Sequence, residues 1–368
     1  MRITFLLPGG GLSGGVRVVA IYAEALSRLG HKVLVAHPAR RHLTLKSKLK
    51  SWVRGRGWPK DVAREPSHLD GRSFEKRVVA AGRPILDADV PDADVVVATW
   101  WETAEWAARL APSKGAKAYF IQGDEATFPG QPGDRVEATY RLPMHRITIS
   151  GWLMKVLRDR YGTADVTLVP NGVDLDQFRA SPRGKQPVPT VGFLYSRLRF
   201  KGCDIILDAV AAARKQLPAL SLVAFGNEPP GPPHVFPPGT VFEVCPAQDR
   251  LRELYARCDA WLFASRSDGF GLPLVEALAC RTPIIGVPMG AAPELVDAGG
   301  GFLVRAEDAA DMSRAILKVA SMTNEEWRAL SERAHAIAAA RSWAASIKLK
   351  EQALRTAGER GRGTPHPG

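Results

Sequence analysis

Two acidic residues with seven residues between them, Asp268 and Glu276, stand in the most informative segment of the chain. The segment follows a predicted strand and opens a predicted helix, which places Asp268 just before the helix and Glu276 about one turn inside it. Carboxylates at these two depths are able to accept hydrogen bonds from the hydroxyls of one sugar-like ligand. The alternative is a polar strand-to-helix loop in which Glu276 is an ordinary surface residue.

The turn between these two acids has the features of an anion site. Its residues Gly269, Phe270, Gly271 and Leu272 precede Pro273, and proline is favoured in a first helical turn because its missing N–H costs nothing there. The free N–H groups of the turn and the positive end of the helix dipole favour a negatively charged ligand. We therefore expect a diphosphate to bind here.

A second glycine-rich turn lies near the amino terminus. The run from Gly9 to Gly15 comes between a predicted strand, 3–7, and a predicted helix, so Gly14 and Gly15 let a phosphate or a sugar approach the backbone. The run lacks the spacing of a dinucleotide fingerprint or a Walker loop. It is either a donor or acceptor contact or merely a flexible loop.

Aromatic and polar residues follow two further predicted strands, and they are candidates for the acceptor site. Trp100 and Trp101 come directly after one strand, where an indole face can stack on a sugar, although at least one of the pair is also a candidate for the core. Gln122 ends the other strand and can hydrogen-bond a sugar hydroxyl, but its amide cannot act as a base. Asp124 follows, with a merely solvated loop carboxylate as the alternative interpretation.

Short β-type runs alternate with helix-type periodicity along the chain, which predicts parallel sheets covered by helices. A stretch rich in proline, glycine and charge, 180–189, separates two series of strands and is predicted to be an interdomain linker. The first series is 3–7, 32–36, 94–99, 118–122, 146–150 and 166–170. The second series is 190–196, 220–226, 241–245, 260–265, 283–287 and 301–304.

These series predict two Rossmann-like α/β domains. In open sheets of this kind ligands bind beyond the carboxyl ends of the strands, so the candidate residues are expected to face one crevice between the domains. Such domains also occur in dehydrogenases, kinases and binding proteins, so the residues and not the fold must identify the reaction. The expected parts are a first domain over 1–179, the linker over 180–189, a second domain over 190–340, a crossover helix over 341–357 and a disordered tail over 358–368.

The order of these motifs resembles that of family 4 of the retaining glycosyltransferases, which have the GT-B fold. The family signature has two acids separated by seven residues, like Asp268 and Glu276. The stretch from Val169 to Phe178 resembles the signature at the end of the family's first domain, Lys201 resembles its phosphate-binding lysine, and Gly290 to Val296 resembles a loop that follows a strand. The resemblance covers nearly the whole chain.

This resemblance implies roles for individual residues. Glu276 would bind the donor ribose, and Asp268 would lie beside the transferred sugar. Lys201 and a nearby arginine would neutralise the departing diphosphate, as leaving-group chemistry requires. Either Arg197 or Arg199 could be that arginine, because the spacing before Lys201 is irregular, and we favour Arg197.

Two further features qualify the assignment of site residues. Asp268 stands where the family usually has glutamate, so its reach is one methylene shorter. Many family members have a histidine at the sugar pocket where this chain has Gln122. Glu294, in the loop that matches the family, is assigned by the resemblance to the donor site.

The resemblance implies a protein of the α/β class with the GT-B fold and with carboxyl-terminal helices that return to the first domain. It implies retaining transfer of a sugar from a nucleotide diphosphate sugar to a glycan or lipid-linked acceptor, in cell-envelope polysaccharide or glycolipid synthesis. No cofactor and no metal are required if Lys201, Arg197 and the helix amino terminus balance the diphosphate charge. The alternative is a nucleotide-sugar-binding or scaffold protein that has lost turnover, which Asp268 and the missing histidine would support.

Composition places the 368-residue chain among soluble globular proteins, with 45% hydrophobic and 24% charged residues. The apolar run at the amino terminus is too short for a signal-peptide core, so a cytoplasmic location is expected. The four cysteines lie far apart without metal-ligand spacing and are interpreted as thiols in a reducing compartment.

The formal charge of +12 is concentrated in one part of the chain, because 40–83 holds thirteen Lys or Arg against four Asp or Glu. No nucleic-acid-binding module accompanies this charge, so a nucleic-acid partner is not expected. A basic amphipathic helix within the segment predicts docking on an anionic membrane surface, and a solvated insertion is the alternative. Its apolar face would carry Leu45, Leu49, Trp52 and Val53, and its basic face Lys46, Lys48, Lys50 and Arg54.

Overall fold

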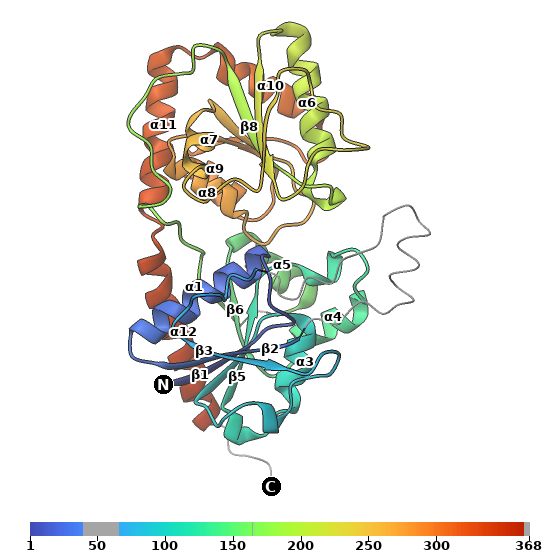
Figure 1. The fold of residues 1–368 in the computed structure, drawn as a ribbon, viewed down its shortest axis with the longest axis vertical. Coiled ribbons are helices and arrows are strands. Elements are labelled where there is room, and N and C mark those ends of the chain that lie inside the picture. Colours follow the sequence, from blue (N-terminus) through green and yellow to red (C-terminus); the bar gives the residue numbers. More distant parts are fainter. Residues whose placement is uncertain (40–65, 164, 364–368) are drawn as a thin grey trace.

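The computed structural model describes residues 1–39, 66–163 and 165–363, and it shows two α/β domains stacked one above the other (Figure 1). The predicted amphipathic segment with Trp52 lies outside these residues. Each domain contains one parallel sheet with helices on both faces, as the alternation of apolar runs and helical periodicity predicts. No helix in the described part of the chain is both long and apolar enough to cross a bilayer.

The first sheet has seven parallel strands in the order β3-β2-β1-β4-β5-β6-β7. Its central strand β4 is buried along its whole length, which accounts for its uninterrupted run of Val and Ala. The strands are β1 (Arg2–Leu6), β2 (Lys32–Pro38), β3 (Glu75–Val79), β4 (Val95–Ala98), β5 (Ala116–Ile121), β6 (His145–Thr148) and β7 (Val166–Leu168). The helices are α1 (Gly14–Arg28), η1 (Asp87–Asp89), α3 (Trp101–Arg109), η2 (Pro112–Lys114), η3 (Glu125–Thr127), α4 (Gly133–Tyr140) and α5 (Gly151–Tyr161).

The second sheet has six parallel strands in the order β10-β9-β8-β11-β12-β13. Its core includes Trp261 and Trp327, which are almost completely buried. The strands are β8 (Thr190–Tyr195), β9 (Ser221–Gly226), β10 (Val241–Val244), β11 (Ala260–Phe263), β12 (Ile284–Gly286) and β13 (Gly301–Leu303). The helices are η4 (Arg199–Lys201), α6 (Cys203–Gln216), α7 (Leu251–Ala256), α8 (Leu272–Ala279), α9 (Ala292–Asp297), α10 (Ala309–Ser321) and α11 (Asn324–Ala339).

Strand β3 is the one strand of the described residues that the sequence pattern did not predict. It pairs with β2 at the edge of the first sheet, and its sequence EKRVV begins with three charged residues. Edge strands tolerate charged side chains, and charge there also discourages pairing with another chain. These residues belong to the basic segment, and their charged side chains replace the apolar run by which the other strands were predicted.

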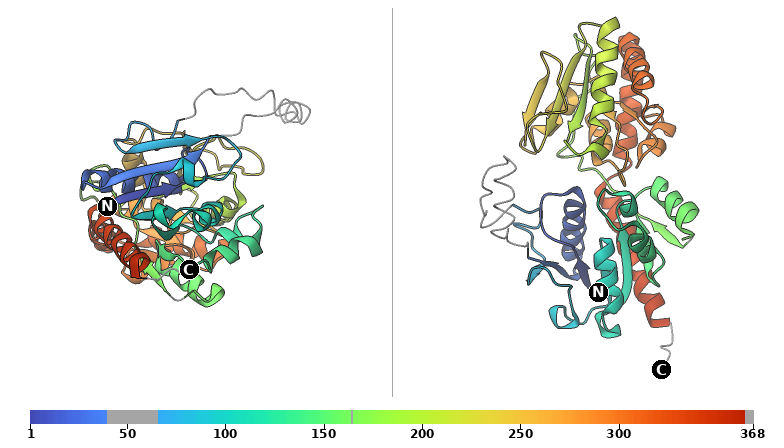
Figure 2. Two further views of the ribbon diagram at one scale, coloured as in Figure 1. Left: turned by 90° about the horizontal axis from the view of Figure 1, so that it is seen from below. Right: turned by 90° about the vertical axis from the view of Figure 1, so that its right-hand side faces the viewer.

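The carboxyl-terminal helix α12 (Trp343–Gly363) returns to the first domain and packs on β5, β4 and α1. Figures 1 and 2 show it running down the side of the first sheet. The tail predicted to be disordered from residue 358 is therefore helical as far as Gly363. The physical reason is close packing: a β-carbon on Gly361 would lie 2.5 Å from Cβ of Ala116, so glycine lets this helix approach the sheet.

The segment predicted to be the linker is tied to the second domain. The Asp259 carboxylate accepts hydrogen bonds from the backbone N–H groups of Gln186 and Thr190, at 2.8 and 2.9 Å. The Arg183 guanidinium lies over the ring of Trp327, 4.4 Å from its centroid. The chain leaves the first domain and reaches the second through this fixed stretch, and α12 makes the return crossing.

Both sheets change direction at their centres, between β1 and β4 and between β8 and β11. Loops that follow two such neighbouring strands diverge and leave a crevice, which is where open α/β sheets bind ligands. The glycine run follows β1 and Trp100 follows β4, while Lys201 follows β8 and Asp268 follows β11. The topology thus brings the predicted residues of each domain to one place.

Candidate active site between the two domains

Lys201 and Asp268 form an ion pair at the centre of the second sheet. Lys201 Nζ lies 2.7 Å from Asp268 Oδ2, and the two side chains are 28% and 17% exposed. The pair forms because β8 and β11 are neighbours, so η4 and the loop before α8 emerge side by side. The lysine expected at the diphosphate and the acid expected at the sugar therefore lie at one point.

Asp268 also caps helix α8. Its Oδ1 accepts hydrogen bonds from the backbone N–H groups of Phe270 and Gly271, at 3.3 and 2.9 Å. Gly271 has a left-handed φ of 80°, which favours glycine and turns the chain into the helix. Two of the N–H groups expected to bind a diphosphate thus already have an acceptor, and Leu272 is the first residue of the helix. The Phe270 side chain is 2% exposed and belongs to the core, so only its backbone borders the cleft.

Glu276 is buried and links the two domains. One carboxylate oxygen accepts a hydrogen bond from Arg17 Nη1 at 3.0 Å, and the other accepts one from the Tyr255 hydroxyl at 2.7 Å. Burial raises the pKa of Tyr255 well above its usual value, and the Glu276 carboxylate beside it adds to the effect. Tyr255 therefore acts as a hydrogen-bond donor to Glu276.

The sequence reasoning missed Arg17 and Tyr255 as partners of Glu276. Arg17 lies in the first turn of α1, three residues after Gly14, and so on a helix that begins at the cleft. Its position in that turn was a signal that could have marked it as a residue facing the second domain. No comparable signal marks Tyr255, which reads as an ordinary core residue of α7.

The glycine run meets the second domain through Gln122. Gly14 and Gly15 are the first two residues of α1, and Ser13 caps this helix. Gln122 Nε2 donates to the Gly15 carbonyl at 3.4 Å. On its other side the Gln122 carbonyl oxygen is so close to Gly269 that a β-carbon there would lie 1.8 Å away. The structure therefore places Gly15, Gln122 and Gly269 around one contact between the domains.

The two candidate arginines differ in whether their guanidinium groups have a hydrogen-bond or ion-pair partner. The Arg197 guanidinium donates to the Pro229 carbonyl at 2.9 Å and lies 3.5 Å from Glu228, so the loop after β9 holds it. The Arg199 side chain is exposed and makes no hydrogen bond or ion pair with any residue that the structure describes. Among the described residues, the Arg199 guanidinium has no partner, whereas that of Arg197, the arginine favoured from the sequence, is held by Glu228 and Pro229.

Arg266 positions the turn that carries Lys201. It pairs with Asp204 at 2.8 Å and with Glu307 at 2.7 Å, and its Nη1 donates to the Arg199 carbonyl at 2.6 Å. Its hydrogen bonds to the two carboxylates raise the pKa of Arg266 above the usual arginine value. This permanently charged residue holds η4 against the loop before α8.

The two tryptophans after β4 lie in different surroundings. Trp101 is 5% exposed, and its indole Nε1 donates to Gln131, so it belongs to the first-domain core and offers no face to an acceptor. Trp100 is partly exposed and packs on Phe128, with ring centroids 5.8 Å apart. Phe128 in turn stacks on Phe200 of the second domain at 6.0 Å. An aromatic chain beginning at Trp100 thus crosses the cleft beside Lys201.

Asp124 is only 4% exposed, so its carboxylate is largely buried, although the residue lines the hollow between α5 and the second domain. Its oxygens accept hydrogen bonds from the Tyr161 hydroxyl at 2.6 Å and from Arg160 at 3.2 Å. Burial raises the pKa of Asp124, and these two partners oppose the rise. The structure places it as an anchor for α5 and Arg160.

Glu294 lies in the first turn of α9 and faces the first domain. Its Oε2 is 3.4 Å from the place of a β-carbon on Gly151, so the carboxylate faces the start of α5 in the first domain. Burial raises the pKa of Glu294, while Arg341 and the Gly151 N–H oppose the rise. Its other oxygen is buried and has no hydrogen-bond partner among the described residues.

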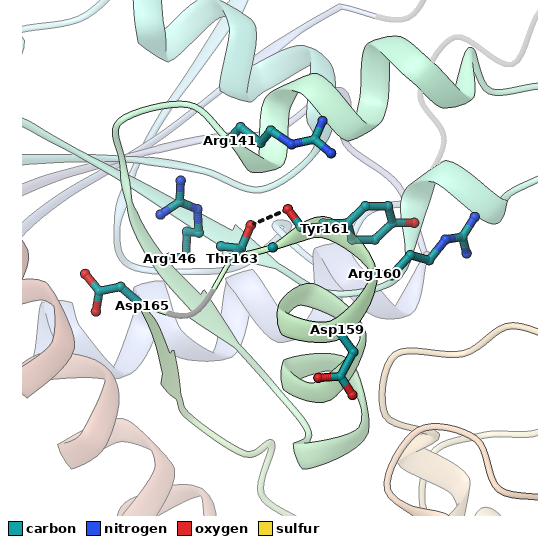
Figure 3. A pocket seen from close by; sticks show the side chains of 8 residues that line it. Arg141, Arg146, Asp159, Arg160, Tyr161, Thr163 and Asp165 are labelled. Carbon is teal, nitrogen blue, oxygen red and sulfur yellow. Dashed lines mark hydrogen bonds between the residues drawn. The ribbon is translucent and has the colours of Figure 1, made fainter.

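Two hollows lie near α5. One encloses about 830 Å³ between α5 and the second domain, and its walls include Trp152, Ser267 and Glu294. The other, of about 780 Å³, lies at the end of α5 in the first domain and includes Arg141 and Arg146 (Figure 3). Neither is lined by Lys201, Asp268 or Glu276, and Glu294 is the predicted donor residue that lines the larger one.

Comparison with protein families identifies both halves of the chain. A sequence model described as "Glycosyltransferase Family 4" matches residues 12–177, and one described as "Glycosyl transferases group 1" matches residues 188–322. The boundary between the two matches falls in the segment that connects the two sheets. Together they include Gly14, Gly15, Lys201, Asp268 and Glu276.

Curated relatives carry glycosyltransferase names. A D-inositol 3-phosphate glycosyltransferase of Corynebacterium jeikeium is 29% identical over 55% of this chain, and the chain spans about half (55%) of that relative's length. A protein of the same name, numbered 1, from Catenulispora acidiphila is 28% identical over 74% of this chain and 75% of its own length.

Solved structures show the same fold. Anabaena HepE in complex with UDP-glucose matches with a TM-score of 0.71 at 18% identity, over 98% of this chain and 100% of that one. Sucrose-phosphate synthase from Thermosynechococcus elongatus matches with a TM-score of 0.69 at 16% identity, over 97% of this chain and 99% of that one. At such identities the likeness concerns the fold, which is of the GT-B type.

Proposed function

Because the chain belongs to the family 4, group 1 glycosyltransferases, we propose that it transfers a sugar from a nucleotide diphosphate donor to a glycan or lipid-linked acceptor, with retention at the anomeric carbon. The observation that carries the proposal is the Lys201–Asp268 ion pair at the crevice between β8 and β11. A cation and a sugar-binding acid stand there beside the amino terminus of α8. The resemblance assigns the same two residue types to the diphosphate and to the sugar.

Donor binding would rearrange this ion pair. The diphosphate carries more negative charge than a single carboxylate, so it competes with Asp268 for Lys201. Asp268 then keeps its bonds to the N–H groups of Phe270 and Gly271 through one oxygen and offers the other to a sugar hydroxyl. Glu276, fixed by the Tyr255 hydroxyl, lies deeper and would accept hydrogen bonds from the ribose.

The proposed chemistry is a front-face displacement. The bond between the anomeric carbon and the diphosphate oxygen breaks, and the acceptor oxygen forms the new bond on the same face. The acceptor proton passes to the departing phosphate oxygen, so no side chain must act as base, and Gln122 at the position of the family histidine could not do so. Lys201 stabilises the charge that grows on the leaving group.

Cations of the chain itself would balance the diphosphate, and we infer that no metal is needed. Lys201 lies at the centre, and Arg199 has a free guanidinium on the same turn. Arg197 would contribute if its side chain left Glu228 and Pro229. The amino-terminal end of α8 adds a partial positive charge.

A panel of nucleotide sugars tests the donor class, and UDP-sugars come first because the solved HepE structures contain UDP and UDP-glucose. A ligand at 100 times its dissociation constant adds about 2.7 kcal/mol to the free energy of unfolding. We expect one member of the panel to raise the melting temperature. Stabilisation without any turnover would favour the alternative, a binding or scaffold protein of the same fold.

We also propose that the basic segment 40–83 docks the enzyme on an anionic cytoplasmic membrane face, close to an envelope or lipid-linked acceptor. The support is its nine excess positive charges. Electrostatic docking weakens as the Debye length falls from about 10 Å at 0.1 M salt to about 3 Å at 1 M. Co-sedimentation with anionic vesicles should therefore be lost at high salt. It should also be lost when Lys46, Lys48, Lys50 and Arg54 are changed to glutamine, and equal sedimentation in every case would contradict the docking.

A further inference from the structure

The hollow of about 830 Å³ forms a groove along one face of helix α5, and we call it the α5 groove. Leu153, Leu157 and Tyr161, at four-residue spacing, turn into the core of the first domain. The neighbouring face of the helix lines the groove instead, with Trp152 and Lys155 among its residues. The groove thus has a continuous helical wall with an indole at one end.

The opposite wall belongs to the second domain. Met289 and Pro293 supply apolar surface, and Glu294 supplies a carboxylate. One Glu294 oxygen is buried without a hydrogen-bond partner among the described residues, and a buried acceptor of this kind costs free energy until a donor reaches it. An indole face, small apolar surfaces and an unsatisfied carboxylate are the groups that bind sugar rings and their hydroxyls.

The inner end of the α5 groove leads to the proposed reaction centre. Ser267 and Thr127 both line it, and their hydroxyl oxygens lie 3.2 Å apart across the domain boundary. The next residue after Ser267 is Asp268. A ligand in the groove would therefore present its end to the acid expected beside the transferred sugar.

The outer end of the groove continues into the second hollow, because Asp159 and Arg160 line both. Figure 3 shows Arg141 and Arg146 around this outer end. The Arg141 side chain makes no hydrogen bond or ion pair with any described residue, and the same holds for Lys155 along the groove. Arg160 lies eight positions after Trp152 on α5, which corresponds to a rise of about 12 Å along the helix.

From this arrangement we propose that the α5 groove binds the acceptor, an oligosaccharide that carries an anionic group at the end away from its reacting sugar. Sugar rings lie against Trp152 and Glu294, and Arg141 receives a carboxylate, sulfate or phosphate. The inference rests on the proposed transferase function and names the acceptor class for it. It differs from the expected acceptor contact at Trp101, which is buried in the core.

A glycan array tests this inference with probes of matched backbone. The array carries neutral oligosaccharides of two to six units and the same backbones bearing a carboxylate, a sulfate or a phosphate. The parent is compared with Trp152→Ala and Arg141→Gln. Trp106→Ala on α3 and Arg328→Gln on α11 are matched controls, since Trp106 is also partly buried and Arg328 is also exposed. Each protein is titrated with UDP in parallel.

We expect the parent to retain anionic oligosaccharides in preference to the neutral ones. Trp152→Ala should weaken all retained probes by roughly tenfold or more, because the stacking surface is lost. Arg141→Gln should abolish the preference for charge and keep the neutral backbone. Both controls should behave like the parent, and UDP affinity should stay constant throughout.

Two results would overturn the α5 groove as the acceptor site while leaving the transferase proposal intact. One is unchanged oligosaccharide binding by Trp152→Ala, and the other is a parent that binds UDP but no oligosaccharide. A parent that binds oligosaccharides through Trp152 but no nucleotide would instead overturn the transferase proposal. The probes that carry a carboxylate, a sulfate or a phosphate show which of these anionic groups the α5 groove binds.

Discussion

Glu276 accepts hydrogen bonds from two residues that belong to different domains, Arg17 and Tyr255. Its carboxylate is thereby fixed, which under the proposed function would reduce the entropy lost when a ribose binds. The arrangement also means that Glu276 holds the two domains together. A change at this residue should affect both the donor and the closure of the cleft.

We predict that Glu276→Gln lowers the affinity for UDP by roughly 10 to 150-fold, since a hydrogen bond to a charged group contributes about 1.5 to 3 kcal/mol. Calorimetric titration with UDP measures the change. Glu105→Gln is the control, because it breaks the ion pair with Arg135 away from the cleft. Equal UDP affinity in Glu276→Gln and the parent would remove Glu276 from the donor site.

Lys201→Ala should lower turnover more than donor affinity, because charge on the diphosphate grows as the glycosidic bond breaks. A loss of about 10² to 10³ in kcat is typical when one such group is removed. Lys215→Ala, at an exposed lysine of α6, controls for the loss of a charge. An unchanged kcat with a raised KM would make Lys201 a binding residue only.

Among the elements, the turn before α8 has the tightest contact with the other domain. A β-carbon on Gly269 would lie 1.8 Å from the Gln122 carbonyl oxygen, and the Ser150 hydroxyl donates to the Gly269 carbonyl at 2.7 Å. Nothing but glycine fits between the two loops in this arrangement. The closed cleft depends on that close approach.

We therefore predict that Gly269→Ala holds the domains apart and reduces turnover while both domains stay folded. Small-angle scattering should report a larger radius of gyration, and circular dichroism an unchanged helix content. Gly133→Ala at the start of α4 is the matched control, since its β-carbon would meet one atom at an ordinary 3.8 Å. A Gly269→Ala variant with the turnover and the radius of the parent would contradict this packing.

The short helix η3 joins three elements of the first domain through Glu125, which is 1% exposed. Its Oε2 accepts hydrogen bonds from the Trp101 N–H of α3 at 2.7 Å and from the Tyr119 hydroxyl of β5 at 3.0 Å. The backbone N–H of Glu125 donates to the hydroxyl oxygen of Tyr140 in α4, at 2.8 Å. Burial raises the pKa of Glu125 to about 8.

This raised pKa makes stability depend on pH. Between the ordinary carboxyl value and pH 8 the folded chain holds a proton that the unfolded chain has lost, so the free energy of unfolding falls as pH rises through this window. Glu125→Gln cannot ionise and should remove that slope, on the order of a few kcal/mol by pH 8. Urea unfolding at pH 5, 6.5 and 8 measures it, with Glu75→Gln on exposed β3 as the control. A parent whose stability is constant over this range would show that Glu125 folds in its charged form.

The twelve predicted strands are all present, because each is a short apolar run bounded by turn residues. The placement of Lys201 and Asp268 after neighbouring strands was also predictable from the family resemblance, and their roles at a donor stay predictions. A sequence pattern does not predict which segments far apart in the chain come into contact. The Arg17–Glu276 pair joins residues 259 positions apart, and the burial of Trp101 depends on how α3 packs.

At the scale of the whole molecule, two sheets meet with their switch points facing each other, and α12 ties the second domain back to the first. The Arg17–Glu276 ion pair and the Gly269 contact both cross this boundary. Under the proposed function, donor and acceptor would meet where the two domains do. The central claim is therefore that this junction transfers a sugar with retention.

The most direct test follows the anomeric proton by NMR while the parent and Lys201→Ala are incubated with α-linked UDP-sugars. Slow transfer to water takes the place of transfer to the acceptor, so no acceptor needs to be known. We predict that the parent releases UDP together with sugar that first appears as the α-anomer, and that Lys201→Ala releases both about 10² to 10³ times more slowly. Initial appearance of the β-anomer would contradict retention, and equal release by both proteins would contradict catalysis at the Lys201–Asp268 pair.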